Sequence, residues 1–430
     1  MKSFISLHVF FLVLIKTTSS QSIIKTLPGY PGPLPFKLET GYISVGEDDE
    51  IQLFYYFIES ERDPATDPLV LWLTGGPGCS GFSGLVIEIG PLAFDLETFD
   101  GSFPSFIINP YSWTKVASII FIDAPVGTGF SYSTASKGYS TSDTKSVNDN
   151  YLFLRKWLLK HPEFLKNRLY VAGDSYGGKT ATMVALEIAK GNEAGLQPQM
   201  LLQLAKRNCH GEYVNPDPNN YKCLYALQQF DECTKFIRWP HILEPRCISV
   251  SPKPNDFLSG RLFPEDDPLD LIFLSEQERP WCRNNNYLPT SIWANNEMVQ
   301  EALHVRKGTI TNWTRCNGTL SYEYDVDSIL KDHQLLSEKG YQVLAYSGDH
   351  DLLVTYMSTL KWIRKLNLTI DDQWRPWYLG GQIAGYTEKY KNNQAYITFA
   401  TVKGGGHTAP EYMPKECLAM IDRWLSLFPL

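Results

Sequence analysis

The chain has 430 residues, 43% of them apolar, and a formal net charge of −8 at pH 7. This length and composition can bury one large core, or a core with an inserted subdomain. An acidic chain without a basic patch is a poor partner for phosphate backbones, so nucleic-acid binding is not expected.

Residues 1–20 have the pattern of a secretory signal peptide. They begin with the positive Lys2, continue with an apolar run over residues 4–15 and end in small hydroxyl residues. The apolar run is too short to cross a membrane, and no later segment of the sequence is long enough. We therefore expect residues 21–430 to form the mature domain, located outside the cell or in a vacuole.

Eight cysteines and three Asn-x-Ser/Thr sites agree with an oxidising secretory route. The acceptor sites are Asn312, Asn317 and Asn367. Asn312 and Asn317 are so close in the sequence that glycosylation of both is not expected. The spacing of the cysteines does not choose among the many pairings that eight cysteines allow.

Several apolar runs in the first half of the chain predict strands. A turn-rich arm at residues 27–35 precedes candidates at 41–45 and 52–58, which an acidic turn separates as in an antiparallel hairpin. The runs at 69–73 and 118–122 are continuously apolar, which is typical of strands buried on both faces.

The strand candidate at residues 69–73 ends in the glycine-rich loop TGGPGCS, residues 74–80. A glycine loop directly after a core strand can bring backbone N–H groups beside a nucleophile, as in half of an oxyanion hole. A purely structural turn is the alternative, and this segment alone does not decide between the two.

The candidate nucleophile lies in residues 168–190. An apolar run at 169–172 leads into the turn GDSYGG, residues 173–178, and a helix-like segment follows. Strand, glycine-pinched turn and helix form the context in which Gly-x-Ser-x-Gly becomes a nucleophile elbow. The turn would present Ser175 near a helix N-terminus, whose amide groups favour developing negative charge.

The remaining sequence adds helices, strands and an insertion. Helical patterns occur at 148–160, 293–305 and 414–427, and strand candidates at 342–346 and 396–402. Residues 205–285 are rich in cysteine, proline and asparagine and show weak periodicity, which predicts a disulfide-tied cap.

The last two strand candidates run into loops that offer the partners of a serine nucleophile. The first loop carries Asp349 and Asp351, and the second carries His407. The order serine, acid, histidine, with polar residues beyond strand ends, is typical of this fold class. We assign Ser175 as nucleophile, His407 as general base and acid, and Asp351 as the carboxylate that orients the imidazole, with Asp349 as its rival.

Four blocks resemble the signature motifs of the serine carboxypeptidase family, and the plant serine carboxypeptidase-like branch is the most similar. They are WLTGGPGCS (72–80), GDSY (173–176), SGDHD (347–351) and GGGHTAP (404–410), within a resemblance that covers residues 41–427. The resemblance implies an α/β-hydrolase fold, with a mostly parallel central sheet flanked by helices. Neither a His-Glu-x-x-His motif nor a phosphate loop is present, so we expect no metal and no cofactor.

The family resemblance also implies an oxyanion hole on the backbone N–H groups of Gly76 and Tyr176. It implies the disulfides Cys79–Cys316, Cys209–Cys223 and Cys247–Cys282, which leaves Cys233 and Cys417 as candidate free thiols.

Peptidases of the family grip the free carboxylate of the substrate with Asn, Trp and two Glu. Trp72 and Glu88 match this set, whereas Thr74 and Asp174 replace the Asn and one Glu. We expect these four residues and Gly75 to bind the substrate. A carboxylic acid holds a carboxylate only when one of the two is protonated, so such a pair works best at acid pH. The Thr and Asp pattern resembles members that transfer acyl groups from glucose esters to an alcohol.

Two further departures concern the region after the nucleophile. Gly177 stands where the family normally carries Ser or Ala, and we expect the turn to tolerate it. Cys209 follows Ser175 by only 34 positions, where relatives carry an additional core strand. Either residues 199–204 take the place of that strand or the sheet lacks it.

Three hypotheses for the function follow. We favour a secreted carboxypeptidase that forms an acyl-enzyme on Ser175 and hydrolyses peptides at their C-terminus. The second is an acyltransferase that uses glucose esters as donors. The third is an inactive secreted glycoprotein, in which the short segment after Ser175 prevents the site from adopting its catalytic geometry. The expected partner is a peptide or a small acyl ester, and the sequence does not give the oligomeric state.

Overall fold

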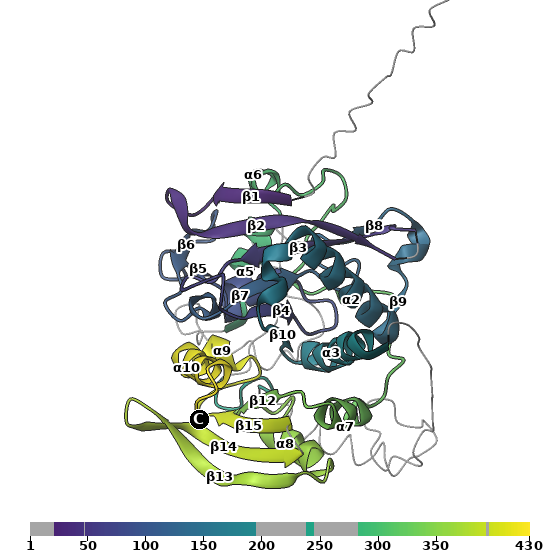
Figure 1. The fold of residues 1–430 in the computed structure, drawn as a ribbon. Coiled ribbons are helices and arrows are strands. Elements are labelled where there is room, and N and C mark those ends of the chain that lie inside the picture. The colour runs from purple at the N-terminus through teal and green to yellow at the C-terminus, as the bar shows by residue number, and fades with distance from the viewer. Residues whose placement is uncertain (1–20, 47, 195–237, 245–282, 393–394) are drawn as a thin grey trace, which may run out of the picture.

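A computed structural model describes residues 21–46, 48–194, 238–244, 283–392 and 395–430 (Figure 1). The predicted signal peptide, most of the predicted cap and Cys209, Cys223, Cys233, Cys247 and Cys282 lie outside these residues. The predictions made for them therefore stay predictions. No helix in the described part of the chain has the length and hydropathy needed to cross a membrane.

A large mixed sheet occupies the N-terminal part of the molecule (Figure 1). Its strands lie in the order β1 (Gln21–Thr26), β2 (Pro33–Val45), β3 (Ile51–Ile58), β7 (Ser118–Ile122), β4 (Leu69–Leu73) and β10 (Leu169–Gly173), with β8 (Tyr132–Ser133) paired to β3. The strands β7, β4 and β10 are parallel to one another, and the first three are antiparallel. The predicted hairpin is confirmed, since Val45 pairs with Ile51.

Both faces of the parallel strands are buried, as their continuous apolar runs predict. Leu69, Leu71 and Leu73 of β4 pack into the apolar cluster that holds residues of helices α2 (Asp143–Lys160) and α3 (Tyr176–Ala194). Val70 and Trp72 point the other way, into a cluster that includes residues of α10 (Pro414–Leu425). Successive side chains of a strand alternate between its faces, so a helix layer on each side requires apolar residues at every position.

A second sheet carries the C-terminal part of the chain. Its strands lie in the order β12 (Val343–Gly348), β15 (Ala395–Val402), β14 (Gln382–Asn392) and β13 (Thr369–Leu379), and helices α7 (Leu330–Glu338) and α8 (Tyr356–Arg364) lie beside it (Figure 1). The strands β12 and β15 are parallel, whereas the other pairs are antiparallel.

Shorter elements complete the fold. They are α1 (Gly81–Ser83), η1 (Gly84–Glu88), β5 (Leu92–Phe94), β6 (Phe106–Ile108), η2 (Trp113–Lys115), η3 (Ser136–Tyr139), β9 (Thr141–Ser142), η4 (Pro162–Lys166), η7 (Arg283–Tyr287), α5 (Leu288–Ala294), α6 (Glu297–Ala302), β11 (Tyr322–Glu323) and α9 (Ala409–Tyr412).

A cavity separates the edge strands of the two sheets. β10 is the last strand of the first sheet and β12 the first strand of the second, and the described residues supply no strand between them. A cavity of about 790 Å³ lies there, lined by β10, β12 and apolar residues of α3 and α10. All residues of β4 are buried, whereas those of β10 are half-buried. The expectation that a core strand is missing holds for the described residues, and residues 199–204 lie outside them.

One predicted helix is two helices in the structure. The pattern at residues 293–305 falls on α5 and α6, which break at Asn295 and Asn296. The Asn296 side chain accepts a hydrogen bond from Met298 N and so caps α6, while Asn295 Nδ2 donates to Trp313 O. The apolar spacing is compatible with helix on both sides of the break, so periodicity alone misses it.

The carboxylate of Asp123, which follows β7, fastens the glycine loop to the sheet. It accepts hydrogen bonds from Ser80 Oγ at 2.5 Å and from Gly81 N at 2.9 Å. A third donor is Phe130 N at 2.8 Å. Burial nevertheless raises the pKa of Asp123 from 3.8 to about 6, because desolvation disfavours the charged form.

We predict that Asp123 makes stability depend on pH. Its contribution is largest below about pH 4 and is lost as the pH rises to about 6, because the unfolded chain releases this proton earlier than the folded chain. A shift of this size is worth about 3 kcal/mol. In urea unfolding, Asp123→Asn should be less stable than the wild type but should lack this loss. Glu97→Gln, an exposed control, should follow the wild type, and equal pH slopes in all three would contradict the prediction.

Candidate active site

The predicted nucleophile elbow is present as a sharp turn between β10 and α3. Ser175 has a φ of 50°, in the left-handed region that residues other than glycine rarely adopt. Gly177 N donates to Asp174 O at 2.7 Å, which closes the turn. A Cβ atom on Gly177 would lie 1.9 Å from Leu73 O of the neighbouring strand. The elbow therefore packs against β4 with no space for a side chain at this position.

The structure brings Ser175, His407 and Asp351 together. His407 Nε2 lies 2.8 Å from Ser175 Oγ, and His407 Nδ1 lies 2.9 Å from Asp351 Oδ2. Ser175 is exposed, whereas Asp351 is buried and its second oxygen accepts a hydrogen bond from Leu353 N at 2.8 Å. The hydroxyl, the imidazole and the buried carboxylate are linked by hydrogen bonds in that order. This is the geometry of a serine nucleophile, its base and the group that orients the base.

Asp349, the rival carboxylate, has a different position. Its Oδ1 accepts a hydrogen bond from Gly404 N at 2.7 Å, and His350 N donates to Gly405 O at 3.0 Å. These bonds join the loop after β12 to the loop after β15. Because the two strands are parallel neighbours, their ends deliver Asp351 and His407 to the same edge of the sheet.

The glycine loop after β4 lies directly against the nucleophile. A Cβ atom on Gly75 would lie 2.8 Å from Ser175 Cβ and 3.0 Å from Tyr176 N. The predicted disulfide between Cys79 and Cys316 is confirmed, and it ties the loop to a distant part of the chain. The loop that carries Gly75 is thus held beside the first N–H groups of α3.

Three of the five residues predicted to hold the substrate have a buried polar atom without a partner in the part of the chain that the structure describes. Among the described residues, nothing hydrogen-bonds to Trp72 Nε1, Thr74 Oγ1 or Glu88 Oε2. Asp174 Oδ1 accepts a hydrogen bond from Gly75 N at 3.0 Å. A buried polar group without a partner costs about 1–3 kcal/mol, so these three atoms are a local cost to the folded state.

The two carboxyl groups of this set both have raised pKa values. Burial raises the pKa of Glu88 well above its usual range, and the negative charges of Asp174 and Glu411 raise it further. Burial also raises the pKa of Asp174, against the lowering effect of the hydrogen bond from Gly75 N. The pair therefore retains a proton at a pH where free carboxyl groups are ionised.

Arg315 is a functional candidate that the sequence analysis missed. Its positive charge lowers the pKa of both Glu88 and Asp174, so it acts on the carboxyl pair. Its guanidinium lies 4.4 Å from the ring centre of Tyr287. The one signal in the sequence was its position beside Cys316, the predicted partner of the glycine-loop cysteine.

Asp143 is a second residue that the sequence did not single out. This buried carboxylate accepts hydrogen bonds from the hydroxyl groups of Tyr176 and Tyr322 and forms an ion pair with Lys179 Nζ at 3.1 Å. It thereby fastens the first turn of α3, directly after the nucleophile, to the start of α2.

The other predicted site residues differ in accessibility. Asn312 and Asn367 are exposed, whereas Asn317 Nδ2 donates to Gly127 O at 2.9 Å and is engaged inside the fold. Cys417 is a buried free thiol whose pKa burial raises. The described segments contain no group of three or more His, Cys, Asp or Glu placed to hold a metal ion.

We predict that Gly177→Ala destabilises the elbow, because its new methyl group meets the backbone of β4. Overpacking of this kind costs about 1–3 kcal/mol. The matched control is Gly178→Ala, whose Cβ would meet only Gly173 O, at 3.7 Å. Thermal unfolding and the esterase rate of the two variants should separate them, and equal behaviour would contradict the close packing of the elbow.

Comparison with known proteins agrees with this geometry. Residues 28–205 and 195–427 match the family model described as serine carboxypeptidase. Serine carboxypeptidase-like 7 of Arabidopsis thaliana is 44% identical, with 97% of this chain and 96% of the relative aligned. Serine carboxypeptidase-like 10 of the same plant is also 44% identical, over 99% and 98%.

Among solved structures, a prohormone-processing carboxypeptidase from Saccharomyces cerevisiae superimposes with a TM-score of 0.63 over 91% of each chain, at 18% identity. That likeness shows a shared fold. The chain therefore has the α/β-hydrolase fold and belongs to the serine carboxypeptidase family of hydrolases.

Proposed function

We propose that this protein is a serine carboxypeptidase that forms an acyl-enzyme on Ser175 and removes residues from the C-terminus of peptides. The observation that carries the proposal is the hydrogen-bonded chain from Ser175 Oγ through His407 to Asp351. Membership of the family supports the same chemistry.

In the proposed mechanism, His407 Nε2 takes the proton of Ser175 Oγ as the oxygen attacks the scissile carbonyl carbon. Asp351 stabilises the imidazolium through Nδ1–H. The N–H groups of Gly76 and Tyr176 would hold the oxyanion, and the position of the glycine loop beside Tyr176 N supports this assignment. The imidazolium then gives its proton to the leaving amine, and water repeats the sequence on the acyl-enzyme to release the shortened peptide.

The carboxyl pair supports recognition of a free C-terminus. A protonated carboxyl of Glu88 or Asp174 can donate a hydrogen bond to the substrate carboxylate, and Trp72 Nε1 is a further free donor. The raised pKa values of both carboxyl groups favour a retained proton.

A second candidate function is acyl transfer from glucose esters. It would use the same acyl-enzyme on Ser175, with an alcohol in place of water. Thr74 favours it, because its buried hydroxyl lacks a partner and can pair with a sugar hydroxyl. Asp174 favours acyl transfer too. Its Oδ1 already accepts a hydrogen bond from Gly75 N, so only its other oxygen is left to hold a substrate carboxylate.

We further propose that the chain enters the secretory route through residues 1–20 and ends outside the cell or in a vacuole. The disulfide between Cys79 and Cys316 and the exposed acceptor sites Asn312 and Asn367 are compatible with that route.

A direct test offers the enzyme an N-blocked dipeptide and a phenolic glucose ester side by side. The proposal predicts release of the C-terminal amino acid from the dipeptide, with loss of all activity in Ser175→Ala. Transfer of the acyl group from the ester to an added alcohol, with the dipeptide intact, would favour the second candidate. Turnover of neither substrate by folded protein would contradict both.

The pH dependence of substrate binding gives a second prediction. As the pH rises through the raised pKa values of Glu88 and Asp174, the pair loses its proton and repels the substrate carboxylate. The KM for the dipeptide should therefore be higher at alkaline pH than at acid pH. The dipeptide amide, which lacks the carboxylate, should show no such rise. A flat KM for the free acid would contradict this role of the pair.

A further inference from the structure

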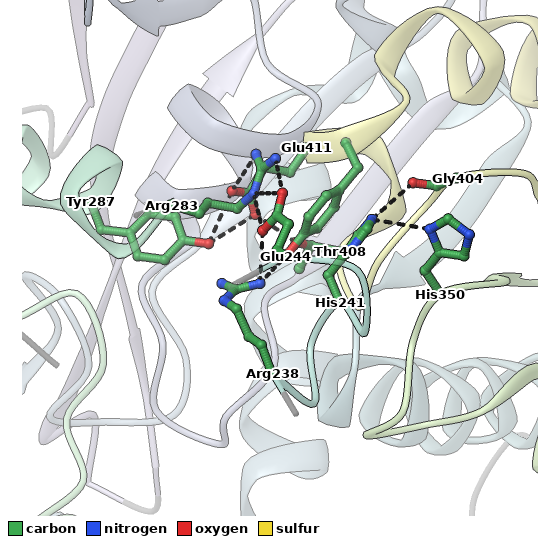
Figure 2. A network of polar contacts seen from close by, with 10 residues as sticks. Arg238, His241, Glu244, Arg283, Tyr287, His350, Gly404, Thr408 and Glu411 are labelled. Carbon is green, nitrogen blue, oxygen red and sulfur yellow. Dashed lines mark hydrogen bonds and ion pairs between the residues drawn. The ribbon is translucent and has the colours of Figure 1, made fainter. Parts of the chain in front are cut away.

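A short segment of the predicted cap touches both loops that carry His407 and Asp351 (Figure 2). We call residues 238–244 the clasp. Two consecutive carbonyl groups of the clasp accept hydrogen bonds from these loops. Leu352 N, next to Asp351, donates to Trp239 O at 2.8 Å, and His407 N donates to Pro240 O at 2.7 Å.

The backbone of the clasp adds a third bond. Ile242 N donates to His350 O at 3.0 Å, on the other side of Asp351. Because Trp239 O and Pro240 O are carbonyls of adjacent residues, the backbone groups of Leu352 and His407 are held at a nearly fixed separation. The hydrogen bond between Asp351 and His407 depends on that separation.

The side chain of His241 reinforces the same junction. It is only 8% exposed, and its ring stacks on Tyr412 with 4.9 Å between the ring centres. Its Nε2 lies 3.2 Å from Gly404 O and 3.3 Å from His350 Nδ1. One imidazole thus contacts both loops, and Figure 2 shows its contacts with Gly404 and His350.

An ionic network anchors the ends of the clasp. Arg238 and Glu244 form an ion pair at 3.1 Å, and Arg283 bridges Glu244 at 2.6 Å and Glu411 at 3.3 Å (Figure 2). Glu411 also accepts a hydrogen bond from Thr408 Oγ1 at 2.7 Å, directly after His407. The network is mostly buried, so its bonds are little weakened by solvent.

We propose that the clasp positions the triad, and that His241 is a positioning residue for His407 and Asp351. The inference rests on the proposed acyl-enzyme function. It assigns to the cap a part in catalysis besides any contact with substrate, because alignment of an imidazole with its carboxylate and its serine sets the rate of acylation.

The test compares His241→Ala with His241→Gln, whose amide N–H can still reach Gly404 O. Leu243→Ala is the matched control, because this neighbour in the clasp is 70% exposed. The readouts are kcat and KM for p-nitrophenyl acetate, a small ester that needs the triad but no cap contact, together with the melting temperature.

We expect His241→Ala to lower kcat about tenfold with little change in KM, which corresponds to a rise of about 1.4 kcal/mol in the activation barrier. His241→Gln should restore most of the rate, and Leu243→Ala should match the wild type. Unchanged kcat in folded His241→Ala overturns the inference, as does an equal loss in both His241 variants. Ester turnover by the wild type without peptide hydrolysis would instead count against the proposed peptidase function alone. A wild type without ester turnover would overturn the triad and this inference with it.

Discussion

The hydrogen bond between Ser175 and His407 joins two sheets that share no strand pair among the described residues. Ser175 follows the last strand of the first sheet, whereas His407 and Asp351 follow two strands of the second. The 790 Å³ cavity lies between β10 and β12. Within the part of the chain that the structure describes, contacts other than sheet pairing therefore hold the two halves of the site together.

Helix α10 supplies one such contact. Its residue Ile421 belongs to the same apolar cluster as Trp72 of the first sheet and Val402 of the second. Trp424 of the same helix lies edge-on against Tyr170 of β10, with 5.3 Å between ring centres. Burial of apolar surface is the dominant stabilising term in folding. Here the buried surface extends from the first sheet to the second.

The glycine loop and the clasp act at shorter range. The disulfide of Cys79 and the buried carboxylate of Asp123 fasten the loop beside Ser175, while the clasp aligns the loops of Asp351 and His407. The unpartnered atoms of the predicted substrate set lie among these rigid parts. A site of this kind is preorganised, which is what differential binding of a transition state requires.

The sequence predicted the elements whose residue pattern is compatible with a single kind of local structure. The continuous apolar runs of β4 and β7 and the glycine-pinched turn at Ser175 fix a buried strand and an elbow by local rules, and the structure agrees. The hairpin of β13 and β14 was missed, because its polar residues and Pro376 hide the alternation of an exposed sheet edge.

Part of the candidate site lay beyond local rules for a different reason. Arg315 and the clasp meet the site through contacts distant in sequence, and no periodicity encodes such contacts. The short spacing after Ser175 left two alternatives, a strand at residues 199–204 or a sheet without it, and residues 199–204 lie outside the described residues. That spacing did not indicate which residues connect the two sheets.

The most direct test of this account is reaction of the folded protein with a fluorophosphonate, followed by mapping of the modified peptide. The account predicts an adduct on the peptide that carries Ser175, and no adduct in a folded His407→Ala variant. Absence of an adduct in folded wild-type protein would contradict it, because the two sheets would then fail to bring His407 to Ser175.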